Sequence, residues 1–211
     1  MKENNVKEMT IEEIKKELGY DFKLVEEHQK VKLSELTPGD SFKDSTGREW
    51  ILLEVSNKRA MCITKNFVLE DTIFDEKTNN FAKSSLYHVL QENILPDILD
   101  AFGTENVLEF DTDLTSDDNL DDYGTVTGKI SLLTDRQYRE YAHLINPVND
   151  TKKYEVNGWW WLATPSSTPK RDVSNIVRCV LPCGSLCNFV CYRRNGVRPF
   201  CIFKSNIFVS K

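Results

Sequence analysis

The C-terminal stretch of residues 159–208 constrains the fold of this chain most, because it reads as strands and turns and shows no helical periodicity. Pro182-Cys183-Gly184 is typical of a tight turn. By strand alternation, we expect Val180, Leu186 and Val190 to point inward around that turn. This part of the chain is therefore predicted to be sheet, and the rest of the fold has to accommodate it.

The preceding segments predict helices as well as strands. Thr10 and Glu13 fit a capping box, and Pro96 favours the start of a second helix inside an apolar helical pattern. We expect helices over 7–18, 84–102 and 135–144, and strands from Phe42 and over 49–55, 60–64 and 130–133. This order is typical of the α+β class, with a mixed, mainly antiparallel sheet and two or more helices.

A strongly acidic segment lies between the second and third predicted helices. Its acidic side chains, with no basic one among them, are Glu109, Asp111, Asp113, Asp117, Asp118, Asp121 and Asp122. We expect residues 109–124 to form a long exposed loop. The segment begins like an EF-hand calcium loop, but Ser116 replaces the glycine of the sharp turn and Asp122 replaces the final glutamate. A solvated loop therefore fits better than a calcium site, and calcium binding remains an open alternative.

The charge of the chain is unevenly distributed. A formal net charge of −6 disfavours nonspecific nucleic-acid binding. Residues 172–211 nevertheless contain six basic side chains and only Asp172 as an acid. This local basic character suits a face that binds an anionic partner, and it equally suits a solvated surface with scattered charges.

We expect neither a membrane-inserted segment nor a secretory signal. No stretch approaches the about 20 apolar residues that a membrane-spanning helix needs. Residues 1–5 lead into a charged segment without the apolar core of a signal peptide. These features predict synthesis in a cytoplasm.

Several blocks of the chain resemble a bacterial and phage domain family of unassigned function. The blocks that carry the resemblance include Gly39-Asp40-Ser41-Phe42, Glu49-Trp50-Ile51-Leu52-Leu53-Glu54-Val55, Trp160-Trp161-Leu162-Ala163-Thr164-Pro165 and Asn195-Gly196-Val197-Arg198-Pro199. The ending is also similar to the C-type-lectin-like fold of formylglycine-generating enzymes and of the variable proteins of diversity-generating retroelements. The resemblance implies a C-type-lectin-like domain over 31–211 after an N-terminal helical extension over 1–30. It places Trp160, Trp161 and Arg198 in the framework.

The resemblance to retroelement variable proteins suggests a test on composition. In those systems a reverse transcriptase rewrites adenines, and the resulting codons cannot encode Lys, Glu, Gln, Met or Trp. None of these five residue types occurs from Asp172 to Phe203, where the composition of the whole chain would give about seven. The composition therefore favours a diversified segment, although strands that are half buried also avoid charged residues.

The cysteines allow three interpretations. Cys179, Cys183, Cys187 and Cys191 recur at every fourth position, which is not the spacing of a zinc site, and no histidine lies near them in sequence. Disulfides would need an oxidising compartment, for which no signal is present. By strand alternation, Cys179, Cys187, Phe189 and Cys191 share one face. That face is either a diversified binding surface or a surface covered by another layer of protein.

A catalytic function is disfavoured by the motifs. A reactive thiolate at Cys187 or Cys191 would need an activating neighbour, and only Arg193 and Arg194 are close in sequence. No nucleophile elbow and no glycine-rich phosphate loop occurs. We therefore expect no enzyme activity, no catalytic residue, no metal and no cofactor, with a cysteine-dependent enzyme as a distant alternative.

These observations predict a ligand-binding, receptor-recognition protein with a diversified C-terminal surface. A structural or assembly protein of the same fold, without diversification, is the alternative. The expected partner is a protein or a cell-surface glycan, and the expected place of action is a phage virion or a cell surface. The expected ligand-binding residues are Trp159, Ser174, Asn175, Arg178, Cys179, Pro182, Cys183, Cys187, Phe189, Cys191, Tyr192, Arg193 and Arg194.

Overall fold

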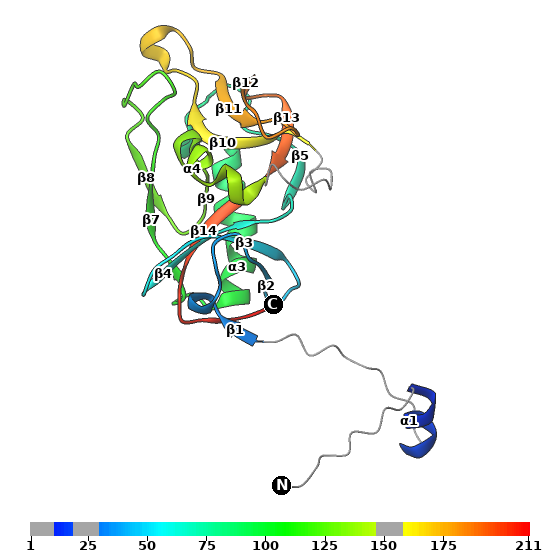
Figure 1. Cartoon of the computed structure of the whole chain (residues 1–211). Coiled ribbons are helices and arrows are strands. Elements are labelled where there is room, and N and C mark those ends of the chain that lie inside the picture. The colour runs from blue at the N-terminus through cyan, green and yellow to red at the C-terminus, as the bar shows by residue number, and fades with distance from the viewer. Residues whose placement is uncertain (1–10, 19–29, 147–157) are drawn as a thin grey trace.

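Three β-sheets organise the computed structural model, which describes residues 11–18, 30–146 and 158–211 (Figure 1). The largest sheet has the order β1 (Lys30–Lys32), β15 (Phe208–Ser210), β2 (Ser41–Lys43), β3 (Glu49–Val55), β4 (Arg59–Thr64), β14 (Pro199–Lys204), β6 (Val107–Leu108), with β9 (Ser131–Leu132) also paired to β14. The second has the order β12 (Leu186–Val190), β11 (Ile176–Val180), β10 (Trp160–Pro165), β13 (Arg194–Val197), β5 (Leu69–Ile73). The third pairs β7 (Phe110–Asp113) with β8 (Thr125–Gly128). Among these described strands, every pairing is antiparallel except that of β10 with β13.

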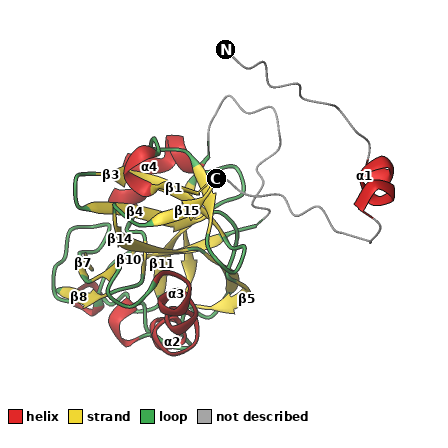
Figure 2. Cartoon of the chain, turned by 90° about the horizontal axis from the view of Figure 1, so that it is seen from below, coloured by secondary structure: helices red, strands yellow, loops and turns green. Residues whose placement is uncertain are grey.

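The described part of the chain also contains several helical elements. They are α1 (Ile11–Leu18), η1 (Leu33–Glu35), η2 (Phe81–Lys83), α2 (Ser85–Val89), η3 (Leu90–Ile94), α3 (Leu95–Phe102), α4 (Asp135–Ile145) and η4 (Pro169–Arg171). Figure 2 shows α2 and α3 on one side of the strands and α4 on the other. Helices combined with mainly antiparallel sheets confirm the predicted α+β class.

The predicted helix over 84–102 is one continuous helical run with a change of pitch in its middle. Ser84 caps it, because its hydroxyl accepts a hydrogen bond from the Tyr87 N–H at 3.1 Å. The central part, η3, is a π-helical turn, and Pro96 stands in the first turn of α3. A proline lacks the backbone N–H, so it is tolerated at the beginning of a helix and not in its interior. Pro96 does not open a separate helix as predicted, because Ile94 and Leu95 before it keep helical backbone angles; it stands where the π-helical turn returns to regular α-helix.

The core forms two clusters, one on each face of the five-stranded sheet. Trp161 belongs to the cluster that includes α2 and α3, and its indole N–H donates to the Thr72 carbonyl at 2.9 Å. Trp160 faces the other cluster and packs edge-on against Tyr138 of α4 at 5.5 Å. Both indoles are buried, as predicted. Because both faces are covered, the side chains of β10 and β11 form framework, not surface.

The acidic segment is not the long loop that was expected. Its first part is β7, in which Phe110 and Thr112 are buried and Asp111 and Asp113 are exposed. Buried and exposed residues alternate, as in a strand with one solvent-exposed face, and β8 is the partner strand. Residues 114–124 connect the two strands, and Asp118 accepts a hydrogen bond from the Ser167 hydroxyl at 2.7 Å. The Asp118 carboxylate thus holds the neighbouring loop around Ser167 in place.

Part of the N-terminal prediction concerns residues that the structure does not describe. Ile11–Leu18 are helical as expected, whereas the Thr10 cap and the rest of the predicted helix before it lie outside the described residues. The predicted boundary between an extension over 1–30 and a domain over 31–211 follows the undescribed residues 19–29, and it stays a prediction. Among the described helices, none is long and apolar enough to cross a membrane.

Candidate functional site

One surface pocket gathers five of the residues that the sequence selected, together with Asn195, which it did not select. The pocket has a volume of about 430 Å³. Its described lining residues are Trp159, Phe189, Tyr192, Arg193, Arg194 and Asn195. They come from the residue before β10, the end of β12, the turn that follows β12 and the start of β13. Segments 30 residues apart in the chain thus meet at one end of the five-stranded sheet.

The turn between β12 and β13 is fixed by backbone hydrogen bonds at Cys191. The Cys191 N–H donates to the Asn175 carbonyl at 2.7 Å, and its carbonyl accepts from the N–H groups of Phe74 and Asp75 at 2.9 and 3.1 Å. The Arg193 N–H closes the turn on the Val190 carbonyl at 3.0 Å. Burying Cys191 in this way leaves Tyr192 and Arg193 projecting outward.

Asp75 anchors the same turn from the side of β5. Its carboxylate accepts backbone hydrogen bonds from Lys77, Thr78 and Ser85 at 2.8–2.9 Å. Partial burial raises the pKa of Asp75, but these hydrogen bonds outweigh burial and leave its pKa below the usual 3.8. The charged carboxylate is therefore the form that the folded state prefers.

This preference predicts a pH-dependent effect of replacing Asp75 by asparagine. At pH 7 we expect D75N to lower the free energy of unfolding by about 1–3 kcal/mol, because backbone donors lose a charged acceptor. A carboxylate with a lowered folded-state pKa stabilises above the unfolded value and stops doing so as pH falls through the folded value. In urea denaturation, the difference between wild type and D75N should thus shrink below pH 3.8. A difference that stays constant down to pH 2 would contradict this role.

The aromatic side chains of the pocket form an angular pair and one projecting ring. Trp159 meets Phe189 with ring centroids 4.8 Å apart and an interplanar angle of 73°. The Arg193 guanidinium lies over the Phe189 ring, 5.8 Å from its centroid. Tyr192 is 53% exposed, an unusual state for a large aromatic side chain. The pocket therefore offers flat apolar surface beside a cation.

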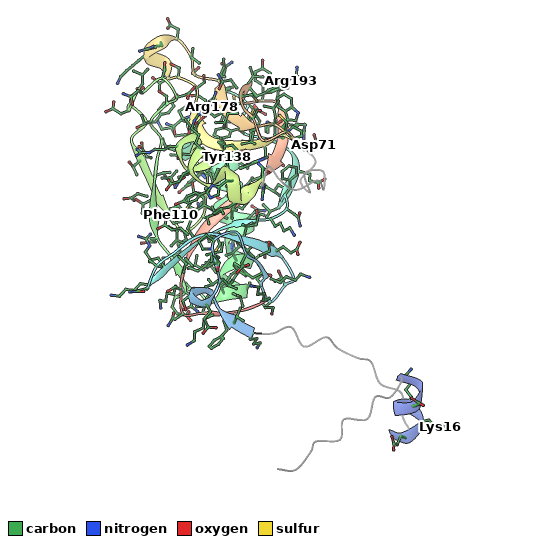
Figure 3. All side chains as sticks on the ribbon, viewed as in Figure 1. Lys16, Asp71, Phe110, Tyr138, Arg178 and Arg193 are labelled. Carbon is green, nitrogen blue, oxygen red and sulfur yellow. The ribbon has the colours of Figure 1, made fainter. Side chains whose placement is uncertain are left out.

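The polar side chains of the pocket differ in how they are held. Arg194 donates from Nη1 to the Asp71 carbonyl oxygen at 2.7 Å, and the Asp71 carboxylate is 3.6 Å away. Arg193 and Asp71 lie at the same end of the molecule (Figure 3). Asn195 is only 6% exposed, and its amide nitrogen has no hydrogen-bond partner among the described residues. The nitrogen is shielded from solvent, so a ligand in the pocket reaches it only when the amide turns by half and exchanges its nitrogen and oxygen.

Next to the pocket, the ending of β13 forms the rigid base. A side chain at Gly196 would place its Cβ 2.5 Å from the Phe67 ring, so only glycine fits there. Arg198 is buried, donates from Nε to the Thr64 carbonyl at 2.9 Å and lies over the Trp160 ring. Burial lowers the pKa of Arg198 to about 10. Arg198 is thus part of the framework, as predicted.

The remaining selected residues do not join the pocket. Ser174, Pro182 and Cys183 are exposed elsewhere, and Asn175 and Cys187 are half buried. Pro182 and Cys183 form the tip of the β11–β12 hairpin, which is closed by the bond from the Gly184 N–H to the Leu181 carbonyl. Gly184 adopts a φ of 80°, which favours glycine.

Arg178, Cys179 and Cys191 were predicted to bind ligand, and the structure corrects this because it buries all three. Arg178 donates from Nε to the Asp135 carboxylate at 2.7 Å and from Nη1 to Asn188 at 2.8 Å. Its guanidinium also lies 3.5 Å from the Asp117 carboxylate. Arg178 therefore ties β11 to α4 and to the acidic connection after β7.

Of the two alternatives for the face that carries Cys179, Cys187, Phe189 and Cys191, the structure supports the covered one for two of the cysteines. Cys179 and Cys191 lie in the core beneath a second layer of the same chain, which was the alternative to a binding face. All six cysteines are free thiols. Burial raises the pKa of Cys191 and, more strongly, of Cys62 and Cys201, so these thiols are poor nucleophiles. Cys183 is exposed, and hydrogen bonds from Ser185 lower its pKa.

Thiol labelling should separate these environments. In a brief reaction with iodoacetamide at pH 7.5, we expect Cys183 to be alkylated first, because it combines exposure with a lowered pKa. Cys62 and Cys201 should react only after unfolding. Peptide mass spectrometry measures the order, and the C183S variant provides the control that removes the fast phase. Labelling of native Cys201 as fast as Cys183 would contradict the burial.

The groups that line the pocket can bind a ligand through ring contacts, ion pairs and hydrogen bonds. Its described lining residues offer ring faces, guanidinium groups and an amide, and they contain no pair of nucleophile and general base. No group of three or more His, Cys, Asp or Glu side chains within the described residues could hold a metal ion. Compared with known protein families, curated proteins and solved structures, the chain has no significant match.

Proposed function

We propose that this protein is a ligand-recognition protein that binds its partner through the pocket of Trp159, Phe189, Tyr192, Arg193, Arg194 and Asn195, called here the aromatic–arginine pocket. The observation that carries the proposal is the convergence of three aromatic and two arginine side chains on one recess. Such side chains dominate binding energy at protein recognition surfaces. The strands β12, β10 and β13 that hold them belong to one hydrogen-bonded sheet, which sets the backbone from which these side chains project.

The distribution of exposed aromatic residues supports this choice of surface. Among the described residues, the exposed large hydrophobic side chains are Tyr192 and Phe208. Phe208 belongs to β15 in the other sheet, where Lys32 lies over its ring. Tyr192 instead projects beside a pocket that other aromatic residues line. An exposed ring next to a recess is what a binding site requires.

As part of the same proposal, the domain is C-type-lectin-like and its surface is diversified, on a phage virion or a cell surface. The absence of Lys, Glu, Gln, Met and Trp from Asp172 to Phe203 supports diversification. The burial of Arg178, Cys179 and Cys191 restricts it to exposed positions such as Tyr192 and Arg193. A near-copy of the coding segment with adenines at these codons, next to a reverse transcriptase gene, tests this. If this copy is absent, the proposal of diversification fails, whereas the proposal of ligand binding stands.

The alternatives have less support. An enzyme that uses both Cys187 and Cys191 would need both thiols to be reachable, whereas Cys191 is fully buried and burial raises its pKa. A structural or assembly protein needs a broad contact face, whereas these aromatic and arginine side chains gather in one pocket of about 430 Å³. Ligand recognition therefore explains more of the described surface than either alternative.

A binding screen with matched alanine variants tests the proposal. The wild-type protein, Y192A and F208A are applied to arrays of glycans and cell-surface proteins. Both substitutions remove an exposed aromatic ring, so neither should disturb the core. We expect Y192A to weaken binding of the selected partner about tenfold or more, and F208A to leave it unchanged. Equal effects of the two variants, or no bound partner, would refute the pocket as the recognition site.

A further inference from the structure

The aromatic–arginine pocket is unbalanced in charge and in hydrogen-bonding groups. Its two guanidinium groups are donors only, and no carboxylate stands among its described lining residues. The nearest described counter-charge is Asp71, which accompanies Arg194 at 3.6 Å. A ligand that satisfies this lining has to bring acceptors and negative charge.

Arg193 is the group most available to such a ligand. It is exposed and forms no ion pair with any described residue. Its described contact is the Phe189 ring, which holds the guanidinium at 5.8 Å from the ring centroid. The N–H groups of this guanidinium form no hydrogen bond with a described residue, so they are available to the two oxygens of a carboxylate.

Asn195 adds a second requirement. Its side chain is nine-tenths buried and lines the pocket, and its nitrogen is enclosed behind that lining without a partner among the described residues. A half turn of the amide exchanges its nitrogen and oxygen, so the group can offer a donor or an acceptor to the ligand. A hydroxyl group can pair with either, which a purely apolar ligand cannot do.

The size and shape of the pocket limit the ligand further. A volume of about 430 Å³ is near the lower end of the range for small-ligand sites. The rings of Trp159 and Phe189 meet at 73°, so they form an angular wall. The C–H groups on one face of a sugar ring pack well on an aromatic face, whose surface is partially negative. The wide apolar core of a protein interface is absent among the described residues around the pocket.

We infer that the pocket binds a carboxylate-bearing sugar, with the carboxylate on Arg193, a ring face on Trp159 or Tyr192 and a hydroxyl on Asn195. This inference rests on the proposed function and specifies its ligand class. Of the six basic side chains in residues 172–211, Arg193 and Arg194 line the pocket, and they place positive charge there on a chain with a net charge of −6.

Titration calorimetry with two acidic probes tests the inference on the full chain. The probes are a galacturonic acid tetramer and sialyllactose, and their neutral counterparts are the carboxyl-reduced tetramer and lactose. We expect at least one acidic probe to bind about tenfold or more tightly than its neutral counterpart, because the charge-assisted bond to Arg193 is lost in the latter. R193A should weaken binding of the acidic probe by a similar factor.

R136A is the matched control, since Arg136 is an exposed arginine on α4 outside the pocket. It removes the same net charge and should leave binding of the acidic probe unchanged. Equal binding of acidic and neutral probes, equal effects of R193A and R136A, or no binding of either acidic probe would overturn the inference. Binding of a hexaglutamate peptide through Arg193, with no binding of the acidic sugars, would also overturn the inference. In these cases the proposed function would still be supported by a partner from the array screen that binds the wild-type protein and not the Y192A variant.

Discussion

Replacing Arg178 by alanine should lower the free energy of unfolding by about 3 kcal/mol, although the sequence suggested an exposed and variable residue. Arg178 is 8% exposed, and Asp135, its partner at 2.7 Å, is 5% exposed. Removing one member of a buried ion pair leaves the other charge without its partner in a poorly solvated place. The loss should fall at the lower end of the usual range, because Arg139 still pairs with Asp135.

The matched control for this prediction is R139A. Arg139 contacts the same carboxylate from the solvent side, with 59% of its side chain exposed. Exposed ion pairs contribute about 0–1 kcal/mol, so R139A should have a small effect. Urea denaturation of both variants at pH 7 gives the comparison. Equal and small losses would mean that Arg178 is not part of the framework and would return it to the candidate binding surface.

Replacing Trp161 by alanine should lower the free energy of unfolding by about 3–5 kcal/mol. The indole is fully buried, meets the Phe74 ring edge-on at 5.8 Å and donates to the Thr72 carbonyl at 2.9 Å. Truncation leaves a cavity in the larger core cluster and an unpaired carbonyl on β5. Because β5 pairs with β13, the damage should spread to the strand that carries Arg194 and Asn195.

Trp159 provides the comparison two residues earlier in the chain. It is half buried and faces the pocket, so W159A should cost at least 2 kcal/mol less than W161A, a difference of the size that separates rim and core positions. W159A should nevertheless weaken ligand binding. Thermal unfolding and ligand titration of the two variants separate the roles. Similar losses of stability in both would show that Trp159 is framework as well.

The sequence was a good guide to elements whose pattern is complete within a short segment. Thr134 and Gln137 form the capping box of α4, and the Glu49–Val55 strand stands where its apolar run predicts it. The strand that begins at Phe110 was missed because acidic residues occupy its solvent-exposed positions and make the segment resemble a loop. The second layer over β11 and β12 was left as one of two alternatives, since periodicity does not say what covers a face.

The candidate site could be predicted only in part, for a related reason. Trp159, Phe189 and the arginines after Cys191 were selected as residue types common in binding surfaces. The burial of Arg178 depends on Asp135, 43 residues earlier, and no local pattern announces that pairing. Asn195 was grouped with the fixed ending Gly196-Val197-Arg198-Pro199, although its amide lines the pocket. Separating surface from framework required the contacts between distant segments.

Fluorine NMR of protein labelled with 5-fluorotryptophan tests the central claim most directly. The chain has four tryptophans, and of these Trp159 lines the aromatic–arginine pocket, whereas Trp50, Trp160 and Trp161 are buried. On addition of the partner selected by the array screen, the Trp159 resonance should shift and the three buried ones should stay in place. An unchanged Trp159 resonance in protein saturated with that partner would show that recognition takes place elsewhere.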